Sequence, residues 1–188
     1  MKLIDVNVLL YAYDDASAQH AACSAWLCVA FNAEETLALP WQTLLAFVRI
    51  ATHSRAVRRP LAAQEACAIV SSWIARPNVA VIGAGERFWE TFQNLVIEAK
   101  VSGPLVTDAA LAALAVEHGA TLCSTDRDFR RFNGLKLEAV SYTHLRQRPV
   151  RWENNASLWA SSRSWQPYST CGSARLSSEP SKSPSRCV

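Results

Sequence analysis

The stretch Lys2-Leu3-Ile4-Asp5-Val6-Asn7 decides the fold of this chain, because a short apolar run ends at once in an aspartate. Two later stretches, Val106-Thr107-Asp108 and Leu122-Cys123-Ser124-Thr125-Asp126-Arg127-Asp128, also place an acid where a strand is predicted to end. In α/β folds, ligands gather at the carboxyl ends of the strands. We therefore expect these acids to meet in one metal-binding cluster.

Strands and helices alternate along the first 140 residues. The predicted strands cover residues 3–6, 36–39, 78–82 and 120–124, with an edge strand at 135–137. Apolar residues at helical spacing predict helices over residues 7–13, 17–32, 40–53, 61–75, 86–100 and 108–118. This alternation predicts an α/β fold, a three-layer sandwich with a central parallel sheet.

Local signals mark the ends of several predicted helices. Ser17 is expected to be an N-cap, Pro40 to occupy a first helical position, and Gly119 to close a helix in the left-handed conformation. The tryptophans of this part lie among apolar helical positions, which favours the core or a partner groove over base stacking: Trp26, Trp41, Trp73 and Trp89.

Charge and composition divide the chain near residue 140. Residues 1–140 carry 12 Lys+Arg against 14 Asp+Glu, whereas residues 141–188 carry 7 against 2. The second part has 12 serines, no aspartate, and three tryptophans without periodic apolar partners. Such a Ser/Arg-rich segment does not bury enough apolar surface to offset the entropy of ordering it, so we expect a disordered tail after a domain at 1–140.

Two interpretations of the 141–188 tail remain. Its basic residues and tryptophans suit a nucleic-acid-binding arm, with charge on phosphates and rings on bases. The abrupt change in composition instead favours a non-native extension, and we prefer that interpretation. The functional hypotheses therefore rest on residues 1–140.

The sequence predicts a cytoplasmic protein. Asp5 interrupts the N-terminal apolar run, and no uncharged stretch reaches the roughly 18 to 20 residues that span a bilayer. The cysteines of the first part show no CxxC spacing, so they are expected to be buried small apolar residues in a reducing compartment: Cys23, Cys28, Cys67 and Cys123.

The acids suggest phosphoryl chemistry. Carboxylates brought close in a cleft repel one another unless they take up protons or share a cation, and oxygen ligands favour Mg²⁺ or Mn²⁺. Such an ion binds a phosphate oxygen, lowers the pKa of a bound water and stabilises the displaced oxygen. Taken singly, Asp5, Asp108 and Asp126 are also suited to capping a turn or helix. Their joint order favours the cluster.

At this point the chain resembles the PIN-domain ribonucleases and, among them, VapC-like toxins of bacterial toxin–antitoxin pairs. The resemblance covers residues 1–140 and none of the tail. It is carried by Leu3-Ile4-Asp5-Val6-Asn7-Val8-Leu9-Leu10-Tyr11-Ala12, by Leu39-Pro40-Trp41 with Phe47-Val48-Arg49-Ile50-Ala51-Thr52, by Thr107-Asp108-Ala109-Ala110-Leu111-Ala112-Ala113-Leu114-Ala115, and by Ser124-Thr125-Asp126-Arg127-Asp128-Phe129 with Phe132-Asn133-Gly134-Leu135.

The resemblance implies a magnesium-dependent endoribonuclease that cuts RNA, often structured RNA such as tRNA or rRNA, and that forms a homodimer. It also implies a cognate antitoxin that silences the enzyme by laying an apolar segment in a groove between helices. The implied roles are Asp5, Asp108 and Asp126 as metal ligands, Asp128 as an auxiliary catalytic acid, Asn7 as a residue that orders the Asp5 loop, and Ser124 or Thr125 as hydrogen-bond partners of the carboxylates.

One departure from the family pattern stands in residues 40–53. The family commonly has a glutamate before its Phe-hydrophobic-Arg sequence, whereas Ala46 precedes Phe47 here. The alternative to an active toxin is thus a catalytically weak module that binds RNA or titrates the antitoxin. A structure-specific DNA nuclease is a third alternative, disfavoured by the few acids and the short chain.

Arginines flank the acids in the sequence. Arg49 suits either phosphate neutralisation or a surface ion pair. A local basic patch that tracks the RNA backbone would draw on Arg55, Arg58, Arg59, Arg127, Arg130 and Arg131.

Overall fold

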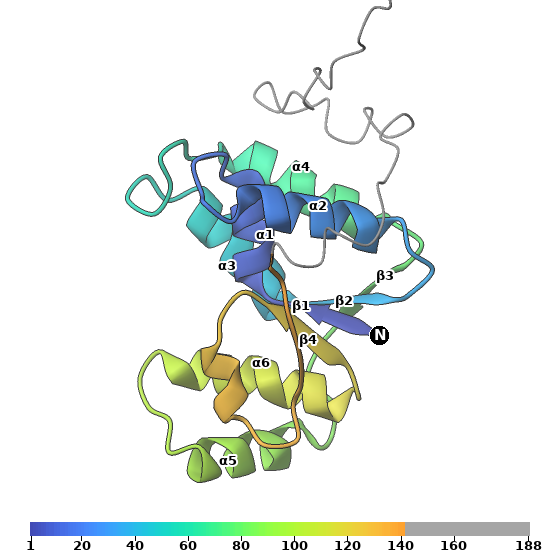
Figure 1. Cartoon of the computed structure of the whole chain (residues 1–188), viewed down its shortest axis with the longest axis vertical. Coiled ribbons are helices and arrows are strands. Elements are labelled where there is room, and N and C mark those ends of the chain that lie inside the picture. Colours follow the sequence, from blue (N-terminus) through green and yellow to red (C-terminus); the bar gives the residue numbers. More distant parts are fainter. Residues whose placement is uncertain (142–188) are drawn as a thin grey trace, which may run out of the picture. The chain divides into compact units, whose positions relative to one another are not determined.

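A computed structural model gives the fold of residues 1–141, the part of the chain that the structure describes (Figure 1). The disordered tail expected at 141–188 lies outside the described residues, except for Ser141. Among the residues described, no helix is both long and apolar enough to cross a membrane.

Five parallel strands form one sheet at the centre of this part. They are β1 (Lys2–Ile4), β2 (Leu37–Pro40), β3 (Val79–Ile82), β4 (Thr121–Ser124) and β5 (Lys136–Ala139). Their order across the sheet is β3-β2-β1-β4-β5. The edge strand predicted at residues 135–137 is therefore confirmed as β5, which pairs in parallel with β4.

Helices cover both faces of the sheet, as Figure 1 shows, so the predicted three-layer α/β sandwich is confirmed. One face carries α1 (Val6–Tyr13), α2 (His20–Phe31), α3 (Trp41–Ala51) and α4 (Ala63–Ile74). The other face carries α5 (Phe88–Glu98) and α6 (Leu105–Glu117), followed after β4 by the short 3-10 helix η1 (Asp128–Arg131).

Alternating side chains along the strands supply both halves of the core. Ile4 and Cys123 pack with α1 to α4, while their neighbours Leu3 and Leu122 pack with α5 and α6. All four side chains are fully buried. Strands buried on both faces carry continuous apolar runs, which explains the apolar character of β1, β2 and β4, whereas the edge strand β5 keeps Lys136 and Glu138.

The direction of winding reverses between β1 and β4. From β1 the chain proceeds through β2 to β3 at one edge, then returns through α6 to place β4 on the other side of β1. Leu3 pairs with Leu122 and Ile4 with Cys123 across this junction. In open α/β sheets, a crevice for ligands forms at such a reversal, outside the carboxyl ends of the strands.

Several local predictions were wrong. Ser17 does not cap α2, because its hydroxyl accepts the Gln19 amide in a turn and the helix begins three residues later. Pro40 ends β2 and precedes α3 rather than occupying its first position. The last helix begins at Leu105, so Asp108 lies in its first turn. Gly119 closes that helix with a φ of 61°, as predicted.

Burial was also overestimated on some helix faces. Cys67 is exposed, whereas Cys23 and Cys123 are buried as expected. Trp26 and Trp73 are core residues, and Trp73 makes edge contacts with Tyr13 and Phe47. Val29 and Leu45, which were expected on buried helix faces, are largely exposed, and so are Trp41 and Trp89, for which the sequence favoured the core or a partner groove.

Candidate functional site

Asp5 is the most buried acid at the carboxyl edge of the sheet. It follows β1 and is 4% exposed. It stands at the N-cap position of α1, yet its side chain makes no capping hydrogen bond, so its carboxylate is not needed to begin the helix. Burial raises the pKa of Asp5, while the Ser124 hydroxyl and the nearby amides of Asn7 and Val6 oppose the rise.

Ser124 joins the ends of β1 and β4. Its hydroxyl donates a 2.6 Å hydrogen bond to Oδ2 of Asp5 and accepts the backbone N–H of Asp126 at 2.9 Å. Ser124 is 1% exposed, so both bonds are shielded from water. Of the two hydroxyls considered from the sequence, Ser124 therefore contacts an acid, and Thr125 lies half-buried beside it.

Asp126 and Asp128 occupy the loop after β4. Oδ1 of Asp126 accepts the Asp128 amide at 2.8 Å, so the turn-capping role weighed from the sequence is present, and it leaves Oδ2 uninvolved in that bond. Asp128 is exposed and pairs with Arg131 at 3.0 Å, and Arg131 Nε also donates to the Asp128 carbonyl. The negative charge of Asp128 is thus partly neutralised by the nearby Arg131.

Asp108 approaches the same edge from the first turn of α6. Its pKa is raised to about 6, first by burial and then by the negative charges of Asp5, Asp126 and Asp128, while Arg131 opposes the rise. Asp108 therefore lies within electrostatic range of the other three acids that the sequence indicated.

These acids form an all-oxygen donor set, which suits a hard divalent cation. Mutual repulsion gives them a reason to take one up, because a cation lowers the energy of the ionised carboxylates. Across residues 1–141, no three His, Cys, Asp or Glu side chains are grouped closely enough to hold a metal ion as they stand. The oxygen ligands of these acids fit a divalent metal, but without one their side chains are not close enough together to coordinate an ion.

The other predicted residues lie at different distances from this centre. Asn7 is in the first turn of α1, and its amide is among those that act on Asp5. Arg49 is exposed on α3, and Ala46 is half-buried on the same helix. Arg59 pairs with Asp15 at 3.6 Å on the surface, which makes it an ordinary exposed ion pair.

Two residues at the start of α3 were missed from the sequence. Thr43 is 2% exposed, and its hydroxyl donates to the Ile4 carbonyl at 3.3 Å, which holds α3 against the end of β1. Its neighbour Gln42 has a buried Nε2 with no hydrogen-bond partner in the described part of the chain. The available signal was a pair of polar residues two and three positions after the apolar strand β2.

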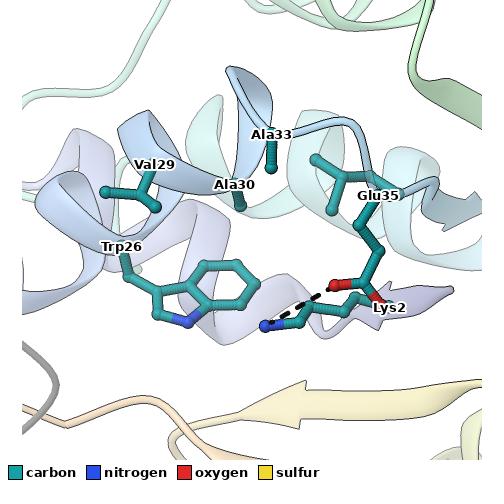
Figure 2. A pocket seen from close by; sticks show the side chains of 7 residues that line it. Lys2, Trp26, Val29, Ala30, Ala33 and Glu35 are labelled. Atoms are coloured by element: carbon teal, nitrogen blue, oxygen red, sulfur yellow. Dashed lines mark ion pairs between the residues drawn. The ribbon is translucent and has the colours of Figure 1, made fainter.

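The opposite, amino edge of the sheet carries a small pocket of about 80 Å³ (Figure 2). Lys2 pairs with Glu138 at 2.8 Å and lies 4.0 Å from Glu35, and its Nζ lies over the Trp26 ring at 5.4 Å from the centroid. Trp26 Nε1 donates to Glu138 at 3.0 Å, and Glu35 pairs with the N-terminal amine at 3.1 Å. The polar groups named here are therefore satisfied by one another.

Sequence comparison links this chain to a defined family. The PIN domain family matches residues 2–135. Ribonuclease VapC37 of Mycobacterium tuberculosis is 38% identical over 138 residues, covering 73% of this chain and 96% of the relative. Ribonuclease VapC33 of the same species is 36% identical over 136 residues, covering 72% and 95%.

Solved structures show the same fold at much lower identity. VapBC2 from Rickettsia felis, bound to a DNA fragment from its promoter, matches with a TM-score of 0.55 at 16% identity, covering 74% of this chain and 98% of that one. The sarcin-ricin loop cleaving toxin VapC20 of Mycobacterium tuberculosis matches with a TM-score of 0.53 at 16% identity, covering 72% and 99%.

Proposed function

Because this chain belongs to the PIN domain family and is similar to VapC ribonucleases over nearly their whole length, we propose that Asp5, Asp108 and Asp126 carry its activity. The protein is an endoribonuclease toxin of a toxin–antitoxin pair. The observation that supports the residue assignment is the coupling of the acids: the pKa of Asp108 is raised to about 6 by burial and then by the negative charges of Asp5, Asp126 and Asp128. Uncompensated like charges at a crevice mark a functional site.

Each acid would contribute through its position. Asp5 would be a shielded and oriented ligand, because its carboxylate is buried and is held by the Ser124 hydrogen bond. Asp108 and Asp126 approach from α6 and from the loop after β4, so the three acids come from separate elements around the β1–β4 junction. A divalent cation, Mg²⁺ in our proposal and Mn²⁺ as a substitute, would lower the pKa of a bound water and stabilise the departing oxygen.

Asp128 would be an auxiliary acid. Its pairing with Arg131 keeps it out of the first set of ligands, but it still raises the pKa of Asp108. Arg131 therefore moderates the negative charge of the site from its rim. Arg49, Asn7 and Thr125 are supporting residues in this proposal.

The alternative function is a catalytically weak RNA-binding or antitoxin-titrating module. Ala46 favours it, since a half-buried methyl group on α3 supplies neither a metal ligand nor a base. The variant Ala46→Glu separates the two functions. A large gain in cleavage would indicate that the natural chain is degenerate, whereas little gain or a loss would support a complete site without this acid.

An antitoxin protein and RNA are the partners. The solved structures with this fold include VapBC toxin–antitoxin complexes. We further propose a homodimer, because α3 and α5 leave large apolar side chains exposed: Trp41 at 56%, Leu45 at 65%, Trp89 at 62% and Ile97 at 70%. A tRNA or rRNA substrate and a cytoplasmic location belong to the same proposal.

The decisive experiment is cleavage of a total tRNA pool by the purified chain. The reaction is run with Mg²⁺, with chelator, and with the Asp108→Ala variant at equal protein concentration. Discrete cuts that need metal and vanish in the variant would support the nuclease and its site together. A parent protein that leaves the tRNA pool intact under both conditions, and likewise ribosomal RNA in a parallel reaction, would contradict the active-toxin function.

A further inference from the structure

Thr43 makes an unusual tertiary hydrogen bond from the first turn of α3. A threonine in a helix commonly donates to the carbonyl one turn before it, as Thr52 does to Val48 at 2.7 Å at the other end of α3. Thr43 instead donates to the Ile4 carbonyl at 3.3 Å, across 39 residues of sequence. Thr43 is 2% exposed, so this bond is shielded from water. Its cause lies in the pairing of β1 with β2.

Pro40 explains why a side chain serves the Ile4 carbonyl. In the parallel pairing of β1 with β2, the Lys2 N–H donates to the Thr36 carbonyl at 2.9 Å. The bonds of a parallel ladder are evenly spaced, so the same pattern, continued along both strands, directs the Ile4 carbonyl at the nitrogen of Pro40. Proline has no N–H, and a buried carbonyl needs a donor. The Thr43 hydroxyl supplies the hydrogen bond that Pro40 cannot make.

The bonded carbonyl belongs to the peptide unit that leads into Asp5. The N–H of the same unit is the Asp5 amide, which donates to the Cys123 carbonyl of β4 at 3.0 Å. Thr43 from α3 and Cys123 from β4 therefore hold the two sides of one peptide plane. Because this plane is rigid, the two bonds set the point and direction from which the Asp5 side chain leaves the backbone. Ser124 then holds the carboxylate itself.

We propose that Thr43 is a positioning residue for Asp5, which acts through the peptide unit between Ile4 and Asp5 without touching substrate or metal. The inference rests on the proposed function and deepens it, since Asp5 is a metal ligand there. Groups of a functional site must be held within about 0.5 Å of their productive geometry. A peptide plane held from one side only would let the Asp5 carboxylate move relative to the other acids, so metal would bind more weakly.

The first test is Thr43→Val in the full chain, because valine keeps the β-branched shape and removes the hydroxyl. The dissociation constant for Mn²⁺, measured by calorimetry without RNA, should rise by about 3-fold to 10-fold, less than the roughly 10-fold to 100-fold typical of a partner that touches a ligand directly. Cleavage of total tRNA should fall by a similar factor at limiting Mg²⁺ and recover as Mg²⁺ is raised. Unchanged affinity for Mn²⁺ would overturn the proposal.

Two further variants separate positioning from packing. Thr43→Ser keeps the hydroxyl and should recover most of the Mn²⁺ affinity that valine loses. Thr52→Val is the matched control, because it removes a threonine hydroxyl bond from the other end of the same helix, and its Mn²⁺ affinity should stay within about 2-fold of the parent. A serine variant as weak as the valine variant, or an equal loss in Thr52→Val, would also overturn the proposal.

Pro40→Ala tests the reason for the contact. This substitution restores a backbone N–H that can reach the Ile4 carbonyl, so Thr43→Val should then lower the Mn²⁺ affinity and the melting temperature less than it does in the parent. Such a coupling between the two positions is what a double-mutant cycle measures. Equal losses with and without Pro40→Ala would refute the exchange of donors and the positioning role with it.

Binding of Mn²⁺ also separates this proposal from the function on which it rests. A parent that binds Mn²⁺ but cuts neither tRNA nor rRNA would refute the nuclease function alone, and weaker Mn²⁺ binding by Thr43→Val would still support the positioning of Asp5. A parent that binds and cuts, with Thr43→Val equal to it, would refute only the positioning role. A parent that neither binds Mn²⁺ nor cuts would refute both.

Discussion

Charged groups form ion pairs at the amino edge of the sheet, whereas like charges repel at the carboxyl edge. At the amino edge, Lys2 pairs with Glu138 and approaches Glu35, and Glu35 also takes the N-terminal amine. At the carboxyl edge, the negative charges of Asp5 and Asp126 raise the pKa of Asp108, and Arg131 opposes that rise. The charges at the amino edge are balanced by one another, whereas the acids at the carboxyl edge repel until a cation or a proton neutralises part of their charge.

This difference supports the assignment of the functional site to the acids of the carboxyl edge. Both edges carry acids, and the amino edge also carries a pocket of about 80 Å³. The pocket is lined by groups that already satisfy one another, so it offers little to a charged ligand. Repulsion that the fold retains supports our proposal that the carboxyl edge is the binding site, because a structure selected for stability alone would have relieved it.

Asp108→Asn should have the largest effect and should separate activity from stability. Cleavage should fall by at least about 100-fold, since even outer-shell partners of a metal are worth 10-fold to 100-fold. The metal-free protein should become more stable at pH 7, because a repelled carboxylate is lost. Cleavage assays and urea unfolding in chelator measure the two. A variant that lost activity and stability together would indicate a folding role instead.

Ser124→Ala tests the link between β1 and β4. Losing the 2.6 Å hydrogen bond to a buried carboxylate should lower the free energy of unfolding by about 1.5 to 3 kcal/mol and cleavage by about 10-fold to 100-fold. Ser72→Ala is the control, since its half-buried hydroxyl donates to the Ile69 carbonyl away from the acids. Equal losses in both variants would remove the special role of Ser124.

The pH dependence of stability should reflect the raised pKa of Asp108 at the carboxyl edge. The pKa of Asp108 is raised from 3.8 to about 6, so between these values the folded state binds more protons than the unfolded state. This residue therefore makes stability fall as pH rises from about 4 through 6. Urea unfolding in chelator at pH 4 to 7.5 should show that slope in the parent and a weaker one in Asp108→Asn. Identical slopes would show that Asp108 titrates normally.

Glu138→Gln examines the amino edge and should have a smaller effect. The ion pair to Lys2 is about three-quarters buried, with side-chain exposures of 26% and 24%, so its loss should cost about 0.5 to 1 kcal/mol. The Trp26 hydrogen bond can pass to the amide oxygen. Cleavage should stay within about 2-fold of the parent, as expected for an edge that binds no substrate. A larger change in cleavage would mean that the two edges are coupled through β4 and β5.

Removal of residues 142–188 should have the smallest effect. The PIN domain match ends at residue 135 and the last described strand at Ala139, so the nuclease domain proposed for residues 1–140 does not need the later residues. Metal-dependent cleavage of tRNA and the melting temperature should both match the full chain. Weaker RNA binding by the shortened chain would support the nucleic-acid arm instead.

Much of the fold was predictable because local sequence and tertiary structure agree. Apolar runs at β1, β2 and β4 are buried on both faces, as the sequence predicted for strands inside a parallel sheet. Boundaries were harder, because the competing signals are weak. The helix predicted to begin at Asp108 begins at Leu105 instead, and Ser17 caps a turn rather than the helix it precedes.

The sequence by itself determined the alternation of strands and helices and the identity of the acids, because apolar periodicity and residue type are local properties. Tertiary structure alone decided which of those acids repel one another, that Ser124 rather than Thr125 reaches Asp5, and that Gln42 is left without a partner. Lys2 and Glu138 meet across 136 residues, a pairing that no local pattern records. Hydrogen bonds and charge coupling depend on distances in space, and the order of the strands sets those distances.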